Sequence, residues 1–256
     1  MSRVQTIPST PGMVCGNIAT RDGGQPLSGG EGCIATCHEA VSLRILVISA
    51  HADDAEDALG GTIGRLIEEG HETHYLALSI CEESVPPGFP RDVLHTECLA
   101  STKVLGIPAD LVTIKRLPVR RFPDHRQEIL DEFIGLRKQV EPEVVFGPST
   151  ADVHQDHATV TGEVVRAFRR TSSIFGYDFP WNVLYTAKLD LFYELNERHL
   201  ARKVEALQHY KSQLTKENNC LTEEYVRSLA IERGNRVGVR YAEAFEVVRE
   251  VRRIAP

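Results

Sequence analysis

Two short segments of the sequence concentrate histidine and aspartate, the side chains that bind divalent metals and move protons. The first is the run SAHADD at residues 49–54, which contains His51, Asp53 and Asp54. Neutral imidazole and carboxylate are zinc ligands, and two histidines with one carboxylate leave a coordination position open for water. The segment therefore predicts one half of a metal site.

The second segment is the run PSTADVHQDH at residues 148–157. His154 and His157 are one helical turn apart, so both can face one side of a helix that starts here. Asp156 can orient one of the imidazoles through a hydrogen bond. Either segment alone is also compatible with a helix cap or a solvated helix face. Two such segments, each following an expected strand, favour a metal site.

The elements that must position these segments alternate between strand and helix. Strands are expected over 44–49, 73–79, 111–114 and 144–146, and helices over 55–70, 92–105, 126–140 and 156–170. This alternation predicts an α/β fold: a Rossmann-like doubly wound, mostly parallel sheet with helices on both faces, in a single domain. Ligand sites of such folds lie at the carboxyl ends of the strands, where both segments fall.

The rest of the chain is less regular. After residue 170 we expect a loop with Tyr177, Pro180 and Trp181, a strand near 189–195, two more helices and a final strand over 242–248. Residues 1–42 are rich in Gly, Ser, Thr and Pro and show no strand or helix period, which predicts a flexible N-terminal extension before a domain over residues 43–256. The glycines of the first helix come too late for a phosphate-binding loop and are expected to let that helix approach the sheet; they are Gly60, Gly61 and Gly64.

Composition excludes several classes of protein. The chain has 256 residues, with 36 acidic and 29 basic side chains and a net charge of -7, which argues against a nucleic-acid partner. No apolar run approaches the roughly 20 residues of a membrane span, so no membrane partner is expected. The 6 cysteines are scattered without a regular framework, which is typical of a reducing compartment and predicts a cytoplasmic protein.

The two segments resemble the motifs of the PIG-L (LmbE-like) family of metal-dependent N-acetyl amino-sugar deacetylases, which are AHPDD near a strand end and a later HxDH. The similarity runs from about Arg44 to Val248. It includes further short matches, namely Gly60 to Ile63, Glu97 with Ala100, Leu105-Gly106, Lys203 to Leu207, Ser212-Gln213 and Tyr241 to Phe245.

The resemblance implies a role for each motif residue. By resemblance, His51, Asp54 and His157 hold the metal, Asp53 is the general base, and a protonated His154 assists as acid or electrophile. Tyr225 resembles a tyrosine that helps to bind the oxyanion in some members. A tyrosine on an amphipathic helix is also compatible with a core residue that has a hydrogen-bonded tip.

Three positions depart from the family pattern. Ala52 replaces the usual proline, which changes loop stiffness more than chemistry. Leu94 replaces an arginine of sugar-binding members, and Arg91 is a candidate substitute. Val119 replaces an aspartate that contacts sugar hydroxyls, next to Arg120 and Arg121.

These departures favour a substrate with different hydroxyls or an anionic group, such as a nucleotide sugar, although the two arginines are also compatible with a solvated loop. The aromatic stretch Tyr177-Asp178-Phe179-Pro180-Trp181 is expected to stack on a sugar ring or to cover the core, and Trp181 is the candidate residue for substrate binding.

The resemblance therefore predicts a hydrolase that holds one Zn²⁺ per chain and removes the acetyl group from an amino sugar or a biosynthetic intermediate that contains one. Iron, cobalt or another divalent transition metal is compatible with the same ligands. Two alternatives stay open: an amidase that cleaves a bulkier acyl group, and a carbohydrate-binding protein without turnover. A calcium-dependent hydrolase is disfavoured because calcium prefers oxygen ligands. Assembly into a homo-oligomer also stays open.

Overall fold

The computed structural model describes residues 42–184, 188–217 and 220–252. The predicted flexible extension over residues 1–42 lies outside these residues except for Ser42. Its division from a domain over residues 43–256 therefore stays a prediction. The first strand begins at Arg44, two residues after the start of the described chain.

A seven-stranded sheet in the order β3-β2-β1-β4-β5-β7-β6 forms the middle layer. Strands β3, β2, β1, β4 and β5 are parallel, whereas β7 runs antiparallel to both of its neighbours. This mostly parallel order confirms the predicted doubly wound sheet. The strands are β1 (Arg44–His51), β2 (Glu72–Ser79), β3 (Val112–Ile114), β4 (Val144–Pro148), β5 (Ser173–Tyr177), β6 (Leu189–Leu195) and β7 (Tyr241–Arg249).

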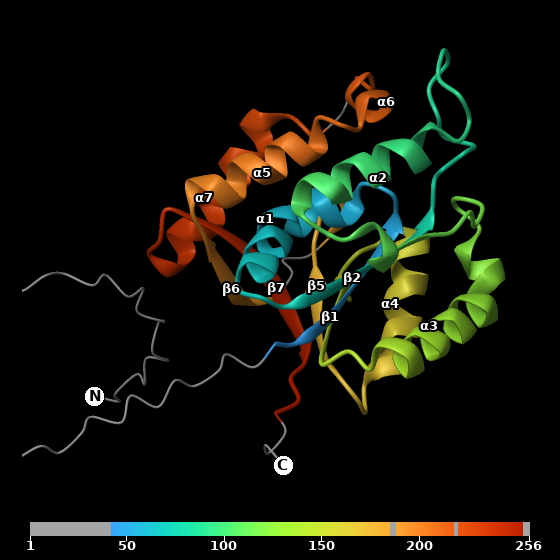
Figure 1. Cartoon of the computed structure of the whole chain (residues 1–256), viewed down its shortest axis with the longest axis horizontal. Coiled ribbons are helices and arrows are strands. Elements are labelled where there is room, and N and C mark those ends of the chain that lie inside the picture. The colour runs from blue at the N-terminus through green and yellow to red at the C-terminus, as the bar shows by residue number, and fades with distance from the viewer. Residues whose placement is uncertain (1–41, 185–187, 218–219, 253–256) are drawn as a thin grey trace, which may run out of the picture. The chain divides into compact units, whose positions relative to one another are not determined.

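Helices cover both faces of the sheet (Figure 1). Successive side chains of β1 point to opposite faces, so Ile45 and Val47 pack toward α1, α2 and α5, while Leu46 and Ile48 pack toward α3 and α4. Both faces of β1 are therefore buried, which explains its nearly continuous apolar sequence. The helices are α1 (Asp54–Glu68), α2 (Val93–Leu105), α3 (Arg126–Val140), α4 (Gln155–Phe168), α5 (Glu197–Leu207), α6 (Lys211–Leu214) and α7 (Glu223–Val237).

One strand was missed by the sequence reasoning. The loop expected after residue 170 is wrong for residues 173–177, which form the fully buried strand β5 between β4 and β7. Five residues are too few to show a clear period, and Gly176 weakens the strand signal. The structure shows why glycine is there: an added Cβ would lie 2.9 Å from the Cα of Ser149. The loop with Pro180 and Trp181 follows, as a short 3-10 turn, Pro180–Asn182.

The strand order places the candidate site. The order reverses between β1 and β4, which pair directly in the middle of the sheet. In doubly wound sheets, ligands bind at the carboxyl ends of the strands that flank such a switch point. His51 is the last residue of β1, and the second histidine segment follows Pro148 at the end of β4. Segments about 100 residues apart in sequence therefore meet at one edge of the sheet.

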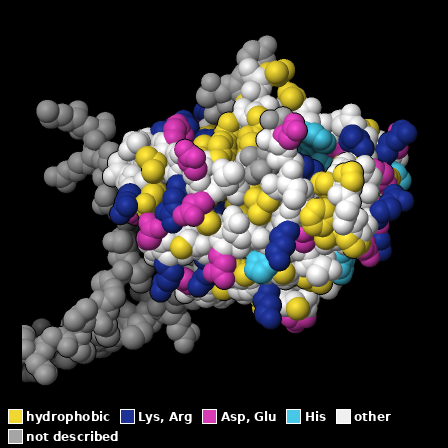
Figure 2. All heavy atoms as spheres, turned by 90° about the horizontal axis from the view of Figure 1, so that it is seen from above, with side chains coloured by type: hydrophobic (Ala, Val, Ile, Leu, Met, Phe, Trp, Pro, Cys, Tyr) yellow, Lys and Arg dark blue, Asp and Glu magenta, His cyan; other side chains and the backbone are white. Residues whose placement is uncertain are grey.

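The face of the molecule shown in Figure 2 carries acidic and basic side chains interspersed with apolar ones, so neither sign of charge dominates it. Within the described residues, no helix combines the length and the apolar character needed to cross a bilayer.

Gly61 of α1 confirms that a glycine lets this helix approach the sheet. A Cβ on Gly61 would lie 2.5 Å from Cδ1 of Leu195 in β6 and 3.2 Å from Oε1 of Glu243 in β7. Gly60 and Gly64 instead face Lys203 and Arg202 of α5. Gly61 thus sets the distance between α1 and the sheet, whereas Gly60 and Gly64 make room for side chains of α5.

We predict that Gly61→Ala lowers the free energy of unfolding by about 1–3 kcal/mol, because the added methyl overpacks a contact that cannot relax freely. Gly162→Ala is the matched control, since Gly162 is also helical and no atom lies within 4 Å of its added Cβ. The control should gain roughly 0.5–1 kcal/mol from helix propensity. Urea unfolding measures both changes, and equal stabilisation of the two variants would contradict the close approach.

Candidate metal centre

The turn between β1 and α1 fixes the first histidine segment by local hydrogen bonds. The Ser49 hydroxyl donates to the His51 carbonyl at 2.6 Å and accepts from the Ala55 amide at 3.1 Å. The His51 amide donates to Oδ2 of Asp54 at 2.7 Å. Asp53 lies between them with φ of 124°, a strained conformation for a residue with a side chain. The turn thus presents His51, Asp53 and Asp54 together at the edge of the sheet.

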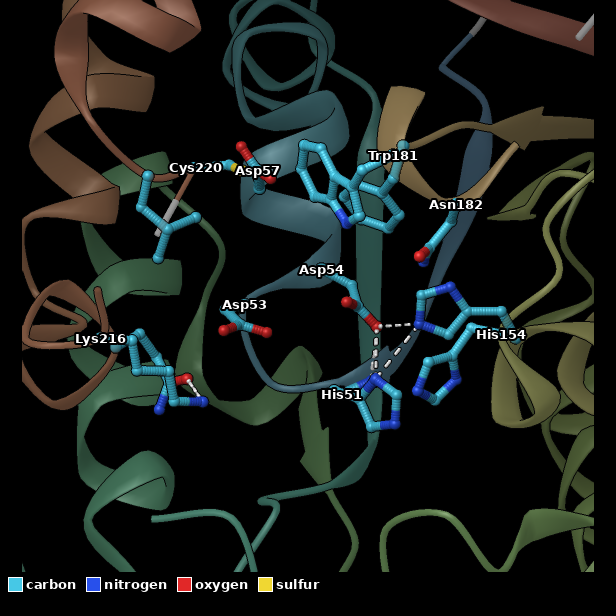
Figure 3. A pocket seen from close by; sticks show the side chains of 13 residues that line it. His51, Asp53, Asp54, Asp57, His154, Trp181, Asn182, Lys216 and Cys220 are labelled. Atoms are coloured by element: carbon cyan, nitrogen blue, oxygen red, sulfur yellow. Dashed lines mark hydrogen bonds and ion pairs between the residues drawn. The ribbon is translucent and has the colours of Figure 1, made fainter. Parts of the chain in front are cut away.

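Three side chains of the two segments converge on one point (Figure 3). Nδ1 of His51 lies 3.3 Å from Oδ2 of Asp54, and Nε2 of His157 lies 3.3 Å from the same oxygen. The two ring nitrogens are 3.2 Å apart. The three atoms therefore form a nearly equilateral triangle, and all three residues are buried.

Two further carboxylates determine which ring nitrogens face the triangle. Oδ2 of Asp156 lies 3.0 Å from Nε2 of His51, and Oδ2 of Asp152 lies 2.7 Å from Nδ1 of His157. Each carboxylate can only accept, so it holds the imidazole proton on its own side of the ring. Nδ1 of His51 and Nε2 of His157 are then lone-pair acceptors, as is the Asp54 oxygen. Three acceptors at this separation require positive charge between them, either a proton on one of the ring nitrogens or a metal ion.

The triangle has the dimensions of a tetrahedral metal site. Zinc lies roughly 2.0–2.1 Å from nitrogen and oxygen ligands, so two ligands of a tetrahedron are about 3.3–3.4 Å apart. The donor set of two imidazoles and one carboxylate also suits zinc or a similar transition metal. His154 belongs to a looser group, in which one nitrogen each of His51, His154 and His157 lie within 4.8 Å of one another. The shorter separations favour Asp54 as the third ligand.

The charges around the three atoms also favour a cation site. Burial opposes ionisation of His51 and His157, but Asp54 and the carboxylates behind the rings raise the pKa of His51 to about 9 and that of His157 to about 10. Burial likewise disfavours the Asp54 anion, yet the two imidazolium charges hold its pKa well below the usual range. The site therefore attracts positive charge, as protons or as a metal that displaces them.

Asp53 differs from Asp54 in its surroundings. Its carboxylate faces the cavity beside the triangle (Figure 3). Burial and the neighbouring Asp54 charge raise the pKa of Asp53 well above its usual value. A carboxylate with a raised pKa next to a cation site is suited to take up a proton.

His154 caps the N-terminus of α4. Its Nδ1 accepts a hydrogen bond from the Asp156 amide at 3.2 Å, which leaves its proton on Nε2. Burial and the charges of His157 and His51 lower the pKa of His154. Its ring lies over the site, 4.7 Å from the His157 ring centroid.

The triangle lies in the wall of a cavity of about 520 Å³, within the size range of small-molecule sites. Of the residues predicted from the sequence, His51, Asp53, Asp54, His154, His157 and Trp181 line it. Phe179, from the aromatic stretch that was expected to stack on a sugar, lines it too. The sequence reasoning gave no site role to the remaining lining residues: Asp57, Asn182, Gln213, Lys216, Cys220 and Leu221.

Two of the missed residues come from a segment that a buried carboxylate holds in place. Glu97 of α2 accepts hydrogen bonds from the amide and the hydroxyl of Ser212, at 2.9 and 2.6 Å. This fixes the start of α6 and with it Gln213 and Lys216, which face the cavity. The resemblance included both Glu97 and the Ser212-Gln213 pair as separate matches, but it did not show that they touch.

Several predicted residues lie away from the cavity. Asp156 is fully buried behind His51, in the position of an orienting side chain. Arg91, Arg120 and Arg121 are exposed, and none of the three lines the cavity. The Arg120 backbone amide donates to Asp156 at 2.6 Å, so this residue supports the site through its main chain. Tyr225 packs against Trp181, with ring centroids 5.7 Å apart, and is not among the lining residues.

Part of the chain matches the model of a known protein family. The family model for PIG-L, described as GlcNAc-PI de-N-acetylase, matches residues 46–168. This match runs from within β1 to the end of α4 and includes both histidine segments. These residues therefore carry a PIG-L family domain.

Similar proteins match about four fifths of the chain. Diacetylchitobiose deacetylase of Thermococcus kodakarensis is 25% identical over 225 residues, which are 80% of this chain and 83% of that protein. The conserved protein TT1542 from Thermus thermophilus superposes with a TM-score of 0.68 at 26% identity, covering 83% of this chain and 97% of the other. The 4-carboxy-2-hydroxymuconate hydratase GalB from Pseudomonas putida has the same fold, with a TM-score of 0.63 at 20% identity over 82% of this chain and 99% of its own. The fold alone therefore does not determine the reaction.

We predict that Asp152→Asn weakens zinc binding by roughly 10- to 100-fold, because the amide no longer fixes the imidazole proton of His157. Asp110→Asn is the control, since Asp110 is exposed on a turn remote from the cavity. Competition with a chromophoric chelator measures both affinities. Unchanged affinity in Asp152→Asn would contradict the orienting role of this carboxylate.

Proposed function

We propose that this protein is a metal-dependent hydrolase that removes the acetyl group from an N-acetyl amino sugar and releases acetate. The observation that carries the proposal is the triangle of three acceptors beside Asp53 in the wall of a ligand-sized cavity. The PIG-L family match and the similarity to a diacetylchitobiose deacetylase support amide hydrolysis over other reactions of this fold.

His51, Asp54 and His157 are the residues that would hold the metal, with Asp156 and Asp152 fixing the two imidazoles. Zinc is the favoured ion because of the donor set, and iron or cobalt is compatible with it. When bound, the ion supplies Lewis-acid polarisation of the amide carbonyl and of the attacking water.

Asp53 acts as the general base in this proposal. It takes a proton from the water that attacks the amide carbon, and it passes a proton to the nitrogen when the C–N bond breaks. The products are acetate and a free amine. The raised pKa of Asp53 suits its role as a proton acceptor.

His154 stabilises the carbonyl oxygen as a neutral hydrogen-bond donor. The sequence led us to expect a protonated imidazole, but burial and two neighbouring histidines lower the pKa of His154. Because Nδ1 accepts the Asp156 amide, the donor is the Nε2 proton. A neutral donor near a developing oxyanion still lowers the barrier, as a backbone amide does in other hydrolases.

Trp181 is the best-placed residue to stack on a sugar ring. Its side chain is 49% exposed at the cavity wall, and it packs between the rings of Phe179 and Tyr225. Tyr225 thus supports Trp181, and its predicted contact with the oxyanion has no support in this arrangement. The predicted substrate contacts of Arg91, Arg120 and Arg121 also lack support, because none of the three lines the cavity. These arginines were the main reason to expect a nucleotide-linked or anionic substrate.

Release of free acetate separates this proposal from an amidase that acts on a bulkier acyl group. A carbohydrate-binding protein without turnover is disfavoured because the proposed base and all three proposed ligands are in place. The cytoplasmic location and assembly into a homo-oligomer stay predictions.

We predict that Asp53→Asn lowers the rate of acetate release from N-acetyl amino sugars by ~10² or more, because amide cannot accept a proton. Metal content should stay at the wild-type level, since Asp53 is not one of the three converging side chains. An enzymatic acetate assay combined with metal analysis measures both properties. Wild-type turnover in this variant would exclude Asp53 as the base.

A further inference from the structure

Asp57 is a second carboxylate in the cavity, and the proposed mechanism does not use it. It lies three residues after Asp54 on α1, so it occupies the same side of the helix one turn, or about 4.5 Å, further along. Figure 3 shows its carboxylate next to Cys220, separated from His51 by Asp54. Asp57 thus faces the cavity, away from the point where the amide would react.

Asp57 lines the cavity, and its carboxylate has no partner among the described residues. Asp57 is only 7% exposed, and it makes no side-chain hydrogen bond or ion pair with any residue in the described parts of the chain. Burial raises the pKa of Asp57 to about 7, against the opposing effect of the Lys203 charge. An unpaired buried carboxylate costs stability, so its presence at a cavity wall indicates a partner that arrives with the ligand.

Lys203, whose positive charge acts on Asp57, is already paired with another carboxylate. Lys203 of α5 donates to Oε1 of Glu243 at 2.7 Å, and both side chains are about 5% exposed. Glu243 also accepts from the amides of Gly61 and Thr62, at 3.1 and 2.6 Å. This network joins α1, α5 and β7, and it is complete without Asp57.

We propose that Asp57 determines substrate specificity by accepting hydrogen bonds from a hydroxyl or ammonium group of the sugar, one helical turn from the reacting amide. This inference rests on the proposed function, since it concerns the same cavity. A carboxylate attracts hydrogen-bond donors and repels anions, so this end of the cavity selects neutral or amine-bearing sugars over phosphorylated ones.

The test measures binding of glucosamine, a candidate product, to the zinc-loaded protein by calorimetry. Asp57→Asn should weaken glucosamine binding by about 10-fold or more, because the hydrogen bonds to a charged acceptor are lost. Asp110→Asn, which removes an exposed carboxylate, should bind as the wild type does. Glucosamine 6-phosphate should bind wild type more weakly than glucosamine, and Asp57→Asn should narrow that difference.

Glucose, which lacks the amine released by the proposed reaction, tests the position of Asp57. Because Asp57 lies one helical turn from the reacting nitrogen, Asp57→Asn should weaken glucose and glucosamine binding by the same factor. A larger loss for glucosamine would place Asp57 beside that nitrogen and contradict the proposal.

Thermal unfolding separates this role from a structural one. Asp57→Asn should melt no lower than wild type, because it removes an unpaired buried charge. A lower melting temperature with unchanged glucosamine binding would make Asp57 part of the Lys203 network and overturn the proposal. Equal glucosamine affinity in the two proteins, or no binding by either, would also overturn it.

Failure of the proposed function gives a different result. Wild type would then release no acetate from N-acetylglucosamine, while glucosamine binding would still depend on Asp57.

Discussion

The constraint on which this structure depends is the mutual approach of three hydrogen-bond acceptors. Nδ1 of His51, Oδ2 of Asp54 and Nε2 of His157 lie 3.2–3.3 Å from one another in a buried place. Such an arrangement is unfavourable unless positive charge lies between the atoms. The fold supplies the two segments at the point where the strand order reverses, and Asp156 and Asp152 keep the imidazole protons on the outer side of the rings.

Four aspartates around this point differ in function because their surroundings differ. Asp152 and Asp156 are buried and saturated with hydrogen bonds, so they can only position their neighbours. Asp53 and Asp57 face the cavity, and burial raises the pKa of both. Asp53 lies beside the triangle of ligand atoms, which makes it the candidate base. Asp57 lies one helical turn further along α1, which makes it the candidate contact to the sugar.

The sequence predicted most of the fold because its strands and helices are long and their periods are clear. It also placed His51, Asp54 and His157 together, since both segments follow strands of a parallel sheet. It missed β5, whose five residues are defined by pairing with β4 and β7. It missed the role of Asp152, because the contact with His157 depends on how the loop after β4 folds back.

The predicted substrate contacts of the three arginines have the least support in the structure, for a physical reason. Spacing in a sequence shows which residues share an element, but not which way a loop directs its side chains. Arg120 reaches the site only through its backbone amide, at a residue with φ of 66°. Asp57 could have been found from the helical spacing, because it lies one turn after Asp54.

The most direct test of the central claim is the metal content of the purified protein, measured by elemental mass spectrometry without added metal. Wild type should contain about one zinc or other transition-metal ion per chain, and His157→Ala should contain almost none. A wild-type protein that stays metal-free after incubation with zinc, or a His157→Ala variant with the same content as wild type, would contradict the claim.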